Sequence, residues 1–143
     1  MPLRSANAVW QGTLQEGSGT VKLGSGLFES GYSFTGRVEE GKSGTTPEEL
    51  IAGAHAGCFA MAFSGQLSKA GFNPTRLDAK ARVNLRVDDS GLKIDSIKLE
   101  VEGEVPGIDE AQFLELAENA KSGCPVSVAL SAVDISLDAR LVS

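Results

Sequence analysis

The sequence has few groups that could bind a metal ion or build a disulfide framework. It contains two cysteines and one histidine among 143 residues. Structural zinc sites use four ligands at close spacing, so a total of three cysteine and histidine side chains argues against a bound metal. Cys58 and Cys124 lie 66 residues apart, which is neither a CxxC redox pair nor a disulfide scaffold. The cysteines must therefore be interpreted one at a time.

The sequence also lacks a basic excess and an apolar leader. The formal net charge of −6 argues against nucleic acid and anionic membranes as partners. The first ten residues, MPLRSANAVW, contain no apolar run typical of a secretory signal, so we expect a cytoplasmic protein in a reducing compartment. With 41% hydrophobic and 22% charged residues, the chain fits one globular domain over residues 1–143.

The hydrophobic pattern predicts an α+β fold rather than a doubly wound one, because hairpins dominate and helices are few. A helix is expected from Pro47 to Lys69, with Thr46 as its cap and Gly71 as its stop. A second helix should begin after Asp109, and a short one after Cys124. Strands are expected at 6–12, 20–23, 32–38, 75–87, 92–101 and 133–141, with a bulge at Asp95–Ser96.

The stretch from Leu50 to Ser68 contains no Asp, Glu, Lys or Arg. It is just long enough to span a bilayer, but glycine, alanine, serine and one histidine dilute its hydrophobicity. A helix that is apolar on all sides has to be buried on all sides. We therefore expect this segment to form a buried central helix.

Each of the two cysteines has two interpretations that are compatible with these patterns. Cys58 could be an inert, packed thiol, because burial among apolar residues raises the pKa of a thiol. It could instead be a nucleophile with His55, three residues earlier, as its base, although a lone buried histidine is more often a packed core residue. Cys124 lies at the start of a short helix, where free amides favour a thiolate, or it is a thiol placed there by accident.

A reactive Cys58 would need a cation, and its own helix carries none between Leu50 and Ser68. Arg37 is the upstream candidate, although a solvated loop arginine is the plainer interpretation. Glu48 precedes Cys58 by ten residues, or about 15 Å along a regular helix. If Glu48 and Cys58 cooperate, Arg37 must bridge them or they must meet across a subunit boundary.

Two segments carry a family resemblance: GTTPEELIAGAHAGCFAMAFSGQLSKAGF and VPGIDEAQFLELAENAKSGCPVSVAL. Together they closely resemble the OsmC/Ohr family of cysteine peroxidases, over nearly the whole chain. His55 favours the OsmC branch, because the organic hydroperoxide resistance branch usually has a tyrosine there. Gly57 departs from the pattern, in which alanine is more usual.

The resemblance implies antiparallel sheets wrapped around a long central helix, in an intertwined homodimer. It implies the reduction of organic hydroperoxides, and more weakly of hydrogen peroxide, in oxidative and osmotic stress defence. Cys58 would be the peroxidatic thiol and Cys124 the resolving thiol, with Arg37 and Glu48 as the activating pair. No cofactor is implied, and the reductant would be an external dithiol of a lipoyl or thioredoxin-like type.

Two rival functions remain open at this point. The chain could be a non-catalytic, stress-related structural or binding protein in which the cysteines only pack. It could also be a thiol hydrolase that uses Cys58 with His55. If it is a peroxidase, we expect a site lined by aromatic or sulfur side chains to favour substrates with apolar tails; the candidates are Phe59, Met61, Phe63 and Phe113.

Overall fold

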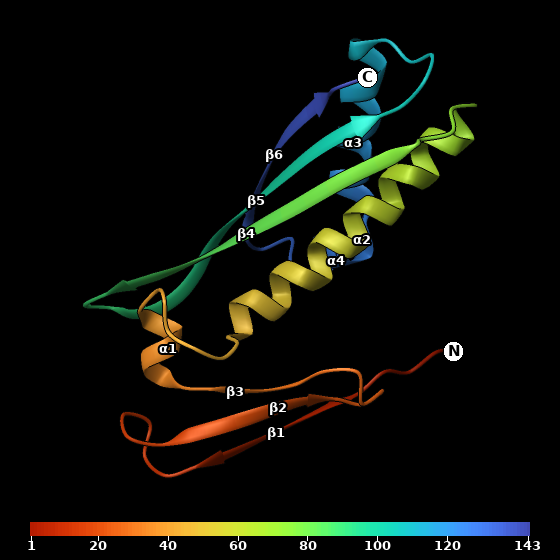
Figure 1. Cartoon of the computed structure of the whole chain (residues 1–143). Helices are drawn as coiled ribbons and strands as arrows, with labels where there is room; N and C mark the ends of the chain where they lie inside the picture. Colours follow the sequence, from red (N-terminus) through yellow and green to blue (C-terminus); the bar gives the residue numbers. More distant parts are fainter. The chain divides into compact units, whose positions relative to one another are not determined.

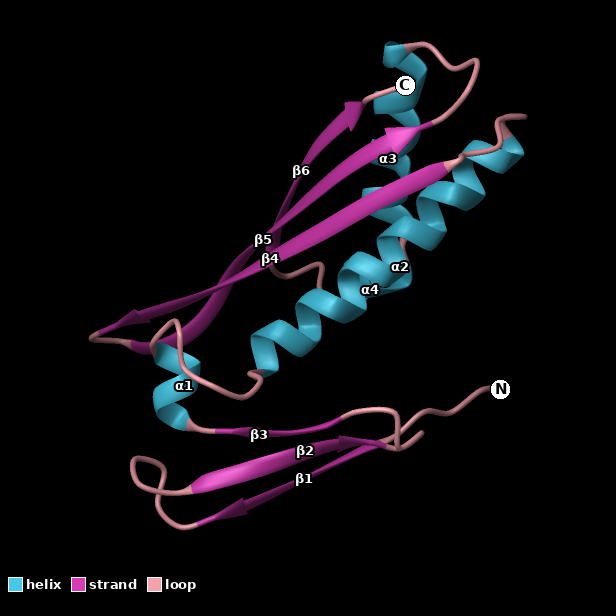
Figure 2. Ribbon diagram, viewed as in Figure 1, coloured by secondary structure: helices cyan, strands magenta, loops and turns pink.

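A computed structural model describes residues 1–143, and the chain divides into two compact units, Met1–Leu50 and Ile51–Ser143. Each unit contains one three-stranded sheet (Figure 1). Figure 2 shows the helices in cyan and the strands in magenta. The α+β class expected from the sequence is confirmed.

The first unit contains an antiparallel sheet with strand order β1–β2–β3. Its strands are β1 (Ala6–Gln11), β2 (Ser18–Leu23) and β3 (Glu29–Tyr32). The strand expected over 32–38 is wrong, because β3 ends at Tyr32 and a short helix, α1 (Phe34–Val38), follows. The Ser33 hydroxyl accepts a hydrogen bond from the Gly36 amide at 3.0 Å, and this cap starts the helix.

Helix α2 (Pro47–Lys69) begins and ends where the sequence predicts. The Thr46 hydroxyl accepts a hydrogen bond from the Glu49 amide at 3.0 Å, which caps the first turn. Gly71 has a φ of 92°, a left-handed conformation that ends the helix and that glycine adopts without strain. Local sequence signals therefore determine both ends of α2.

In the single chain α2 is buried on one face only, so burial on all sides stays a prediction for an assembly of more than one copy. Residues four apart form a buried face, comprising His55, Phe59, Phe63 and Leu67, each 0% exposed. Another face is exposed and made of small or apolar residues, namely Gly53, Ala54, Gly57, Met61 and Gly65. By length and composition alone α2 could cross a membrane, with a mean hydropathy of 1.2 over its most apolar window, of which 22% is buried.

The second unit contains a mixed sheet with strand order β4–β5–β6. Strands β4 (Arg76–Asp88) and β5 (Gly91–Glu104) form an antiparallel hairpin. Strand β6 (Asp134–Leu141) pairs in parallel with β5, so the expectation of purely antiparallel sheets is wrong in this detail. Helices α3 (Glu110–Gly123) and α4 (Pro125–Ala129) connect β5 to β6, and such a crossover returns the chain in the same direction.

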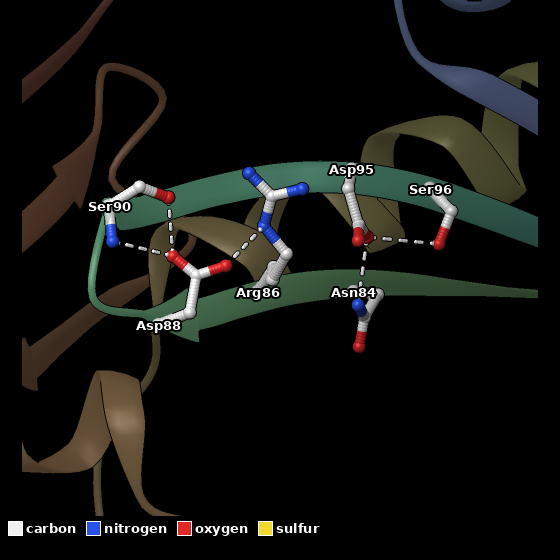
Figure 3. Close-up of polar contacts among 6 residues, drawn as sticks. All are labelled: Asn84, Arg86, Asp88, Ser90, Asp95 and Ser96. Carbon is white, nitrogen blue, oxygen red and sulfur yellow. Dashed lines mark hydrogen bonds and ion pairs between the residues drawn. The ribbon is translucent and has the colours of Figure 1, made fainter.

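The β4–β5 hairpin contains the bulge that the change in hydrophobic phase predicts. Asn84 pairs with Ser96 and Leu85 with Ile94, so Asp95 is the extra residue. Figure 3 shows the Asp95 carboxylate accepting hydrogen bonds from Asn84 Nδ2 at 2.8 Å and Ser96 Oγ at 3.2 Å. At the hairpin end, Asp88 accepts from the Ser90 amide and hydroxyl and pairs with Arg86 (Figure 3). Of these contacts, the one between Asn84 and Asp95 joins the two strands, and it lies at the bulge itself.

The core of the second unit joins α2, α3 and one face of β5. The Phe63 and Phe113 rings pack with their centroids 5.1 Å apart, which brings α2 and α3 together. Gly103 on β5 leaves the space that Phe113 fills. The fully or nearly fully buried apolar residues are Phe59, Phe63, Leu67, Ile97, Leu99, Val101, Val105, Ile108, Phe113, Ala117, Ala120 and Cys124.

Candidate active site

The two cysteines meet in the core of the second unit, although 66 residues separate them in the sequence. Cys58 lies in the middle of α2, and Cys124 lies between α3 and α4, where it ends one helix and caps the other. Both are free thiols, and each is close enough to shift the pKa of the other. The structure therefore brings together the two cysteines that the sequence predicts as a pair.

The two thiols differ in their access to solvent. Cys58 is half-buried, whereas Cys124 is 0% exposed. Burial raises the pKa of the Cys58 thiol, and its interaction with Cys124 raises it further, while the Val126 amide acts in the opposite direction. Within this unit, Cys58 is therefore accessible to a small substrate but is not stabilised as a thiolate.

Cys124 makes two polar contacts with Ser127. Its sulfur accepts a hydrogen bond from the Ser127 amide at 3.3 Å, and the Ser127 hydroxyl lies 3.3 Å away. Burial alone would raise the pKa of Cys124, but these two contacts, with smaller effects from Cys58 and Val126, lower it overall. The buried thiol is the one that its surroundings favour as a thiolate.

His55 does not form the nucleophile–base pair that its spacing from Cys58 allows. Its Nε2 lies 2.7 Å from Ser127 Oγ, and its Nδ1 has no hydrogen-bond partner. Burial lowers the pKa of His55 below its ordinary value, which favours the neutral imidazole. The hydrolase alternative depends on a hydrogen bond between Cys58 and His55, and His55 is instead in contact with Ser127.

Ser127 was given no role by the sequence, although it is the last residue of the GCPVS motif. It is 4% exposed and contacts both His55 and Cys124. The motif could have singled it out, since a serine three residues after an N-cap cysteine faces the sulfur. Its contact with His55 spans 72 residues and has no local signal.

Arg37 and Glu48 form the second predicted pair, and it lies within the first unit. Arg37 Nε donates to Glu48 Oε1 at 3.0 Å, and Arg37 Nη2 donates to Glu48 Oε2 at 2.9 Å. The hydrogen bond with Glu48 raises the pKa of Arg37, against the opposing effect of burial. Side-chain exposure is 33% for Arg37 and 9% for Glu48, so a fixed, partly desolvated guanidinium results.

A cavity of about 450 Å³ adjoins Arg37 in the first unit. Its lining is mostly apolar and aromatic, and the polar groups include the Arg37 guanidinium and the hydroxyls of Tyr32 and Ser33. The lining residues are Trp10, Gly12, Leu14, Tyr32, Ser33, Phe34, Arg37 and Pro47. An apolar chain could occupy this cavity with a polar group directed at Arg37.

The aromatic residues expected to line a substrate site do not do so. Phe59, Phe63 and Phe113 are 0% exposed and belong to the core, where no substrate could reach them. Met61 is 79% exposed on the open face of α2. The helical period of α2 places Phe59 and Phe63 on its buried face and Met61 on its exposed face, and Phe113 lies on α3. Among His, Cys, Asp and Glu side chains, no group of three could hold a metal ion.

Comparison with known proteins identifies the family of this chain. The family model described as OsmC-like protein matches residues 39–138. Peroxiredoxin OsmC of Escherichia coli strain K12 is 46% identical over 141 residues, covering 98% of this chain and 97% of that protein. The chain belongs to the OsmC family. The same identity and coverage hold for Peroxiredoxin OsmC of Shigella flexneri. The family named from the two motifs is confirmed, and the peroxiredoxin names of these relatives confirm the expected enzyme class.

Solved structures show the same fold. The organic hydroperoxide resistance protein OhrB of Bacillus subtilis superimposes with a TM-score of 0.75 at 25% identity, covering 95% of this chain and 98% of its own. An OsmC-like protein from Mycoplasma pneumoniae gives a TM-score of 0.75 at 18% identity, covering 99% of both chains. The OsmC-like fold expected from the sequence is therefore confirmed.

Proposed function

We propose that this protein is a thiol peroxidase that reduces organic hydroperoxides through Cys58 and Cys124, in defence against oxidative and osmotic stress. The observation that carries the proposal is the pairing of an accessible Cys58 with a buried Cys124 in one core. Peroxide must reach the first thiol, whereas the second needs only to reach the first. The difference in burial therefore supports Cys58 as the peroxidatic thiol and Cys124 as the resolving thiol.

The chemistry proceeds in three balanced steps. The Cys58 thiolate attacks the outer peroxide oxygen, the O–O bond breaks, and the alkoxide leaves as an alcohol after taking a proton. Cys58 is now a sulfenic acid, and Cys124 attacks its sulfur to form a disulfide with release of water. An external dithiol then reduces the disulfide by exchange. Such a cycle fits a reducing compartment, for which we propose the cytoplasm.

Arg37 would supply the positive charge that Cys58 lacks in its own unit. A guanidinium held by two hydrogen bonds to Glu48 can stabilise the thiolate and the charge that develops on the peroxide oxygens. Glu48 lies about 15 Å from Cys58 along its own helix, at 1.5 Å per residue. We therefore propose a homodimer in which the Arg37–Glu48 pair of one copy serves Cys58 of the other.

The exposed face of α2 supports the homodimer. Gly53, Gly57 and Gly65 have open space where a side chain would lie, and Met61 beside them is 79% exposed. Small residues at this spacing allow another helix to approach closely, and an exposed apolar face on a long helix needs cover. A second copy of α2 would supply that cover, with residues 1–143 acting as a single domain in each protomer.

The cavity beside Arg37 supports a preference for hydroperoxides with apolar tails. A tail would pack against Trp10, Leu14 and Phe34 while the peroxide group met the guanidinium. We expect a higher kcat/KM for cumene hydroperoxide than for hydrogen peroxide. Equal values for the two substrates would overturn this preference.

The deciding experiment treats the reduced protein with one equivalent of cumene hydroperoxide and measures its mass without reductant. A mass loss of two hydrogens, with a peptide linking Cys58 to Cys124, is expected. Cys124→Ser should instead accumulate sulfinic acid at Cys58 under excess peroxide, and Cys58→Ser should turn over no peroxide. If both thiols of the wild type stayed free, the result would contradict the proposal and favour a non-catalytic protein in which the cysteines only pack.

A further inference from the structure

The mechanism proposed above makes no use of His55 or Ser127, yet both are buried beside the resolving thiol. His55 is 0% exposed, Ser127 is 4% exposed and Cys124 is 0% exposed. His55 Nε2 lies 2.7 Å from Ser127 Oγ, and Ser127 Oγ lies 3.3 Å from Cys124 Sγ. Three side chains from α2, α4 and the junction before α4 therefore form a continuous chain of polar contacts.

The unpaired Nδ1 of His55 indicates which atom donates in each of these polar contacts. If the imidazole proton were on Nδ1, a buried N–H donor would have no acceptor, which is rare and costly. With the proton on Nε2, the histidine donates to Ser127 Oγ, and only an acceptor lone pair is left unpaired. The single hydroxyl proton of Ser127 is then free to point at Cys124 Sγ.

A protonated imidazole is disfavoured at this position. It would carry a buried charge with one N–H unpaired, and burial already lowers the pKa of His55. His55 therefore acts as a neutral donor, and it does not accept a proton from the thiol. Its effect on Cys124 passes through the orientation of one hydroxyl.

We propose that His55 and Ser127 are positioning residues for the resolving step, in which His55 orients the Ser127 hydroxyl so that it stabilises Cys124 as an attacking thiolate. The inference rests on the proposed peroxidase function. It adds that the resolving thiol, Cys124, is also stabilised as a thiolate by its surroundings. Cys124 receives two hydrogen bonds from Ser127, one from the amide and one from the hydroxyl. Only the hydroxyl bond depends on His55.

The step itself needs no further reactant. The Cys124 thiolate forms a bond to the sulfur of the Cys58 sulfenic acid, and the S–O bond breaks as hydroxide leaves with its electron pair. The proton that Cys124 gave up balances the hydroxide, so the products are the disulfide and water. The oxidising equivalents come from the hydroperoxide consumed in the preceding step.

The first test follows the two chemical steps separately after a pulse of cumene hydroperoxide. Ser127→Ala removes the hydroxyl, His55→Leu removes the imidazole donor, and His55→Gln keeps an N–H donor in a side chain of similar reach. Ser131→Ala is the matched control, because Ser131 is an exposed serine just after the same helix. Trapping with dimedone reports Cys58 oxidation, and quenched mass analysis reports disulfide formation.

We expect all variants to form sulfenic acid at the wild-type rate. Disulfide formation should slow about 3- to 10-fold in Ser127→Ala and His55→Leu, because the thiolate fraction falls while the remaining thiolate becomes more nucleophilic. His55→Gln and Ser131→Ala should remain close to wild type. Unchanged disulfide formation in Ser127→Ala and His55→Leu, or His55→Gln as slow as His55→Leu, would overturn the inference.

A second test does not depend on peroxide. Cys58→Ser leaves Cys124 as the single thiol, so its ionisation can be followed by the ultraviolet absorbance of the thiolate as pH is raised. His55 is then the other titratable group in the chain of contacts. Adding Ser127→Ala should raise the midpoint by roughly one pH unit. An unchanged midpoint would overturn the inference. A shifted midpoint together with a wild type that does not consume peroxide would overturn the proposed function, and only the stabilisation of the Cys124 thiolate by Ser127 would stand.

Discussion

Arg37 donates two hydrogen bonds to Glu48, from Nε at 3.0 Å and from Nη2 at 2.9 Å. The parallel arrangement uses both oxygens of the carboxylate and fixes the plane of the guanidinium. Arg37 comes from the last turn of α1 and Glu48 from the first turn of α2, so the single connection over residues 39–46 brings the pair together. An arginine held in this way is prepared to stabilise a negative charge beside it.

The first prediction concerns this geometry rather than the charge alone. Arg37→Lys keeps the positive charge but cannot make two parallel hydrogen bonds with Glu48. We expect kcat/KM for cumene hydroperoxide to fall about 100-fold, as when one donor to a developing oxyanion is lost. Arg4→Lys, at an exposed arginine near the N-terminus, is the control and should keep full activity. A fully active Arg37→Lys variant would contradict the proposed role.

The second prediction concerns the exposed face of α2. Met61→Glu places a charge at the centre of the face that we propose to meet a second copy, where it would be buried without a partner. We expect size-exclusion chromatography with light scattering to show a monomer, with loss of peroxide turnover. Leu114→Glu, at a 39% exposed leucine on α3, should remain dimeric. A dimer that survives Met61→Glu would assign the interface to another surface.

The third prediction concerns the contact between β5 and α3. A methyl group on Gly103 would lie 2.6 Å from Phe113 Cε2, and Phe113 is fixed against Phe63. Gly103→Ala should therefore lower the free energy of unfolding in urea by about 1–3 kcal/mol. Gly123→Ala is the control, because open space surrounds that position at the end of α3. The control should be neutral or slightly more stable, by up to about 1 kcal/mol.

Features set by neighbouring residues could be predicted from the sequence. Thr46 and Gly71 determine the ends of α2 through local hydrogen bonds and a left-handed backbone. The change of hydrophobic phase at Asp95 marked the bulge in β5. The sequence predicts a strand over 32–38, but the hydrogen bond from the Gly36 amide to the Ser33 hydroxyl starts a helix at Phe34 instead. Local capping outweighs a short alternation when the two compete.

Features set by distant residues were recoverable only in part. The parallel pairing of β5 with β6 depends on the path of α3 and α4, which hydrophobic period alone does not specify. The pairing of Cys58 with Cys124 came from the resemblance between motifs and not from spacing. The contact of His55 with Ser127 joins residues 72 positions apart, and a lone histidine in an apolar helix gives no sign of its partner.

The last prediction follows from the burial of His55. Its pKa in the folded protein lies below the ordinary value of 6.5, so the unfolded chain binds more protons as the pH falls below that value. The stabilisation by neutral His55 is thus fully present above pH 6.5 and is lost progressively as the pH falls toward the folded pKa. Between about pH 7.5 and about pH 5.5 the loss should reach at most about 1.4 kcal/mol.

His55→Gln provides the comparison, because glutamine keeps a donor for Ser127 but does not titrate. Urea unfolding at the two pH values should show a larger loss of stability for the wild type than for His55→Gln. Carboxylates titrate in both proteins, so their contribution cancels in the difference between them. Equal losses in both proteins would mean that His55 takes up a proton as easily in the folded chain as in the unfolded one, and that the neutral donor inferred beside Ser127 does not exist.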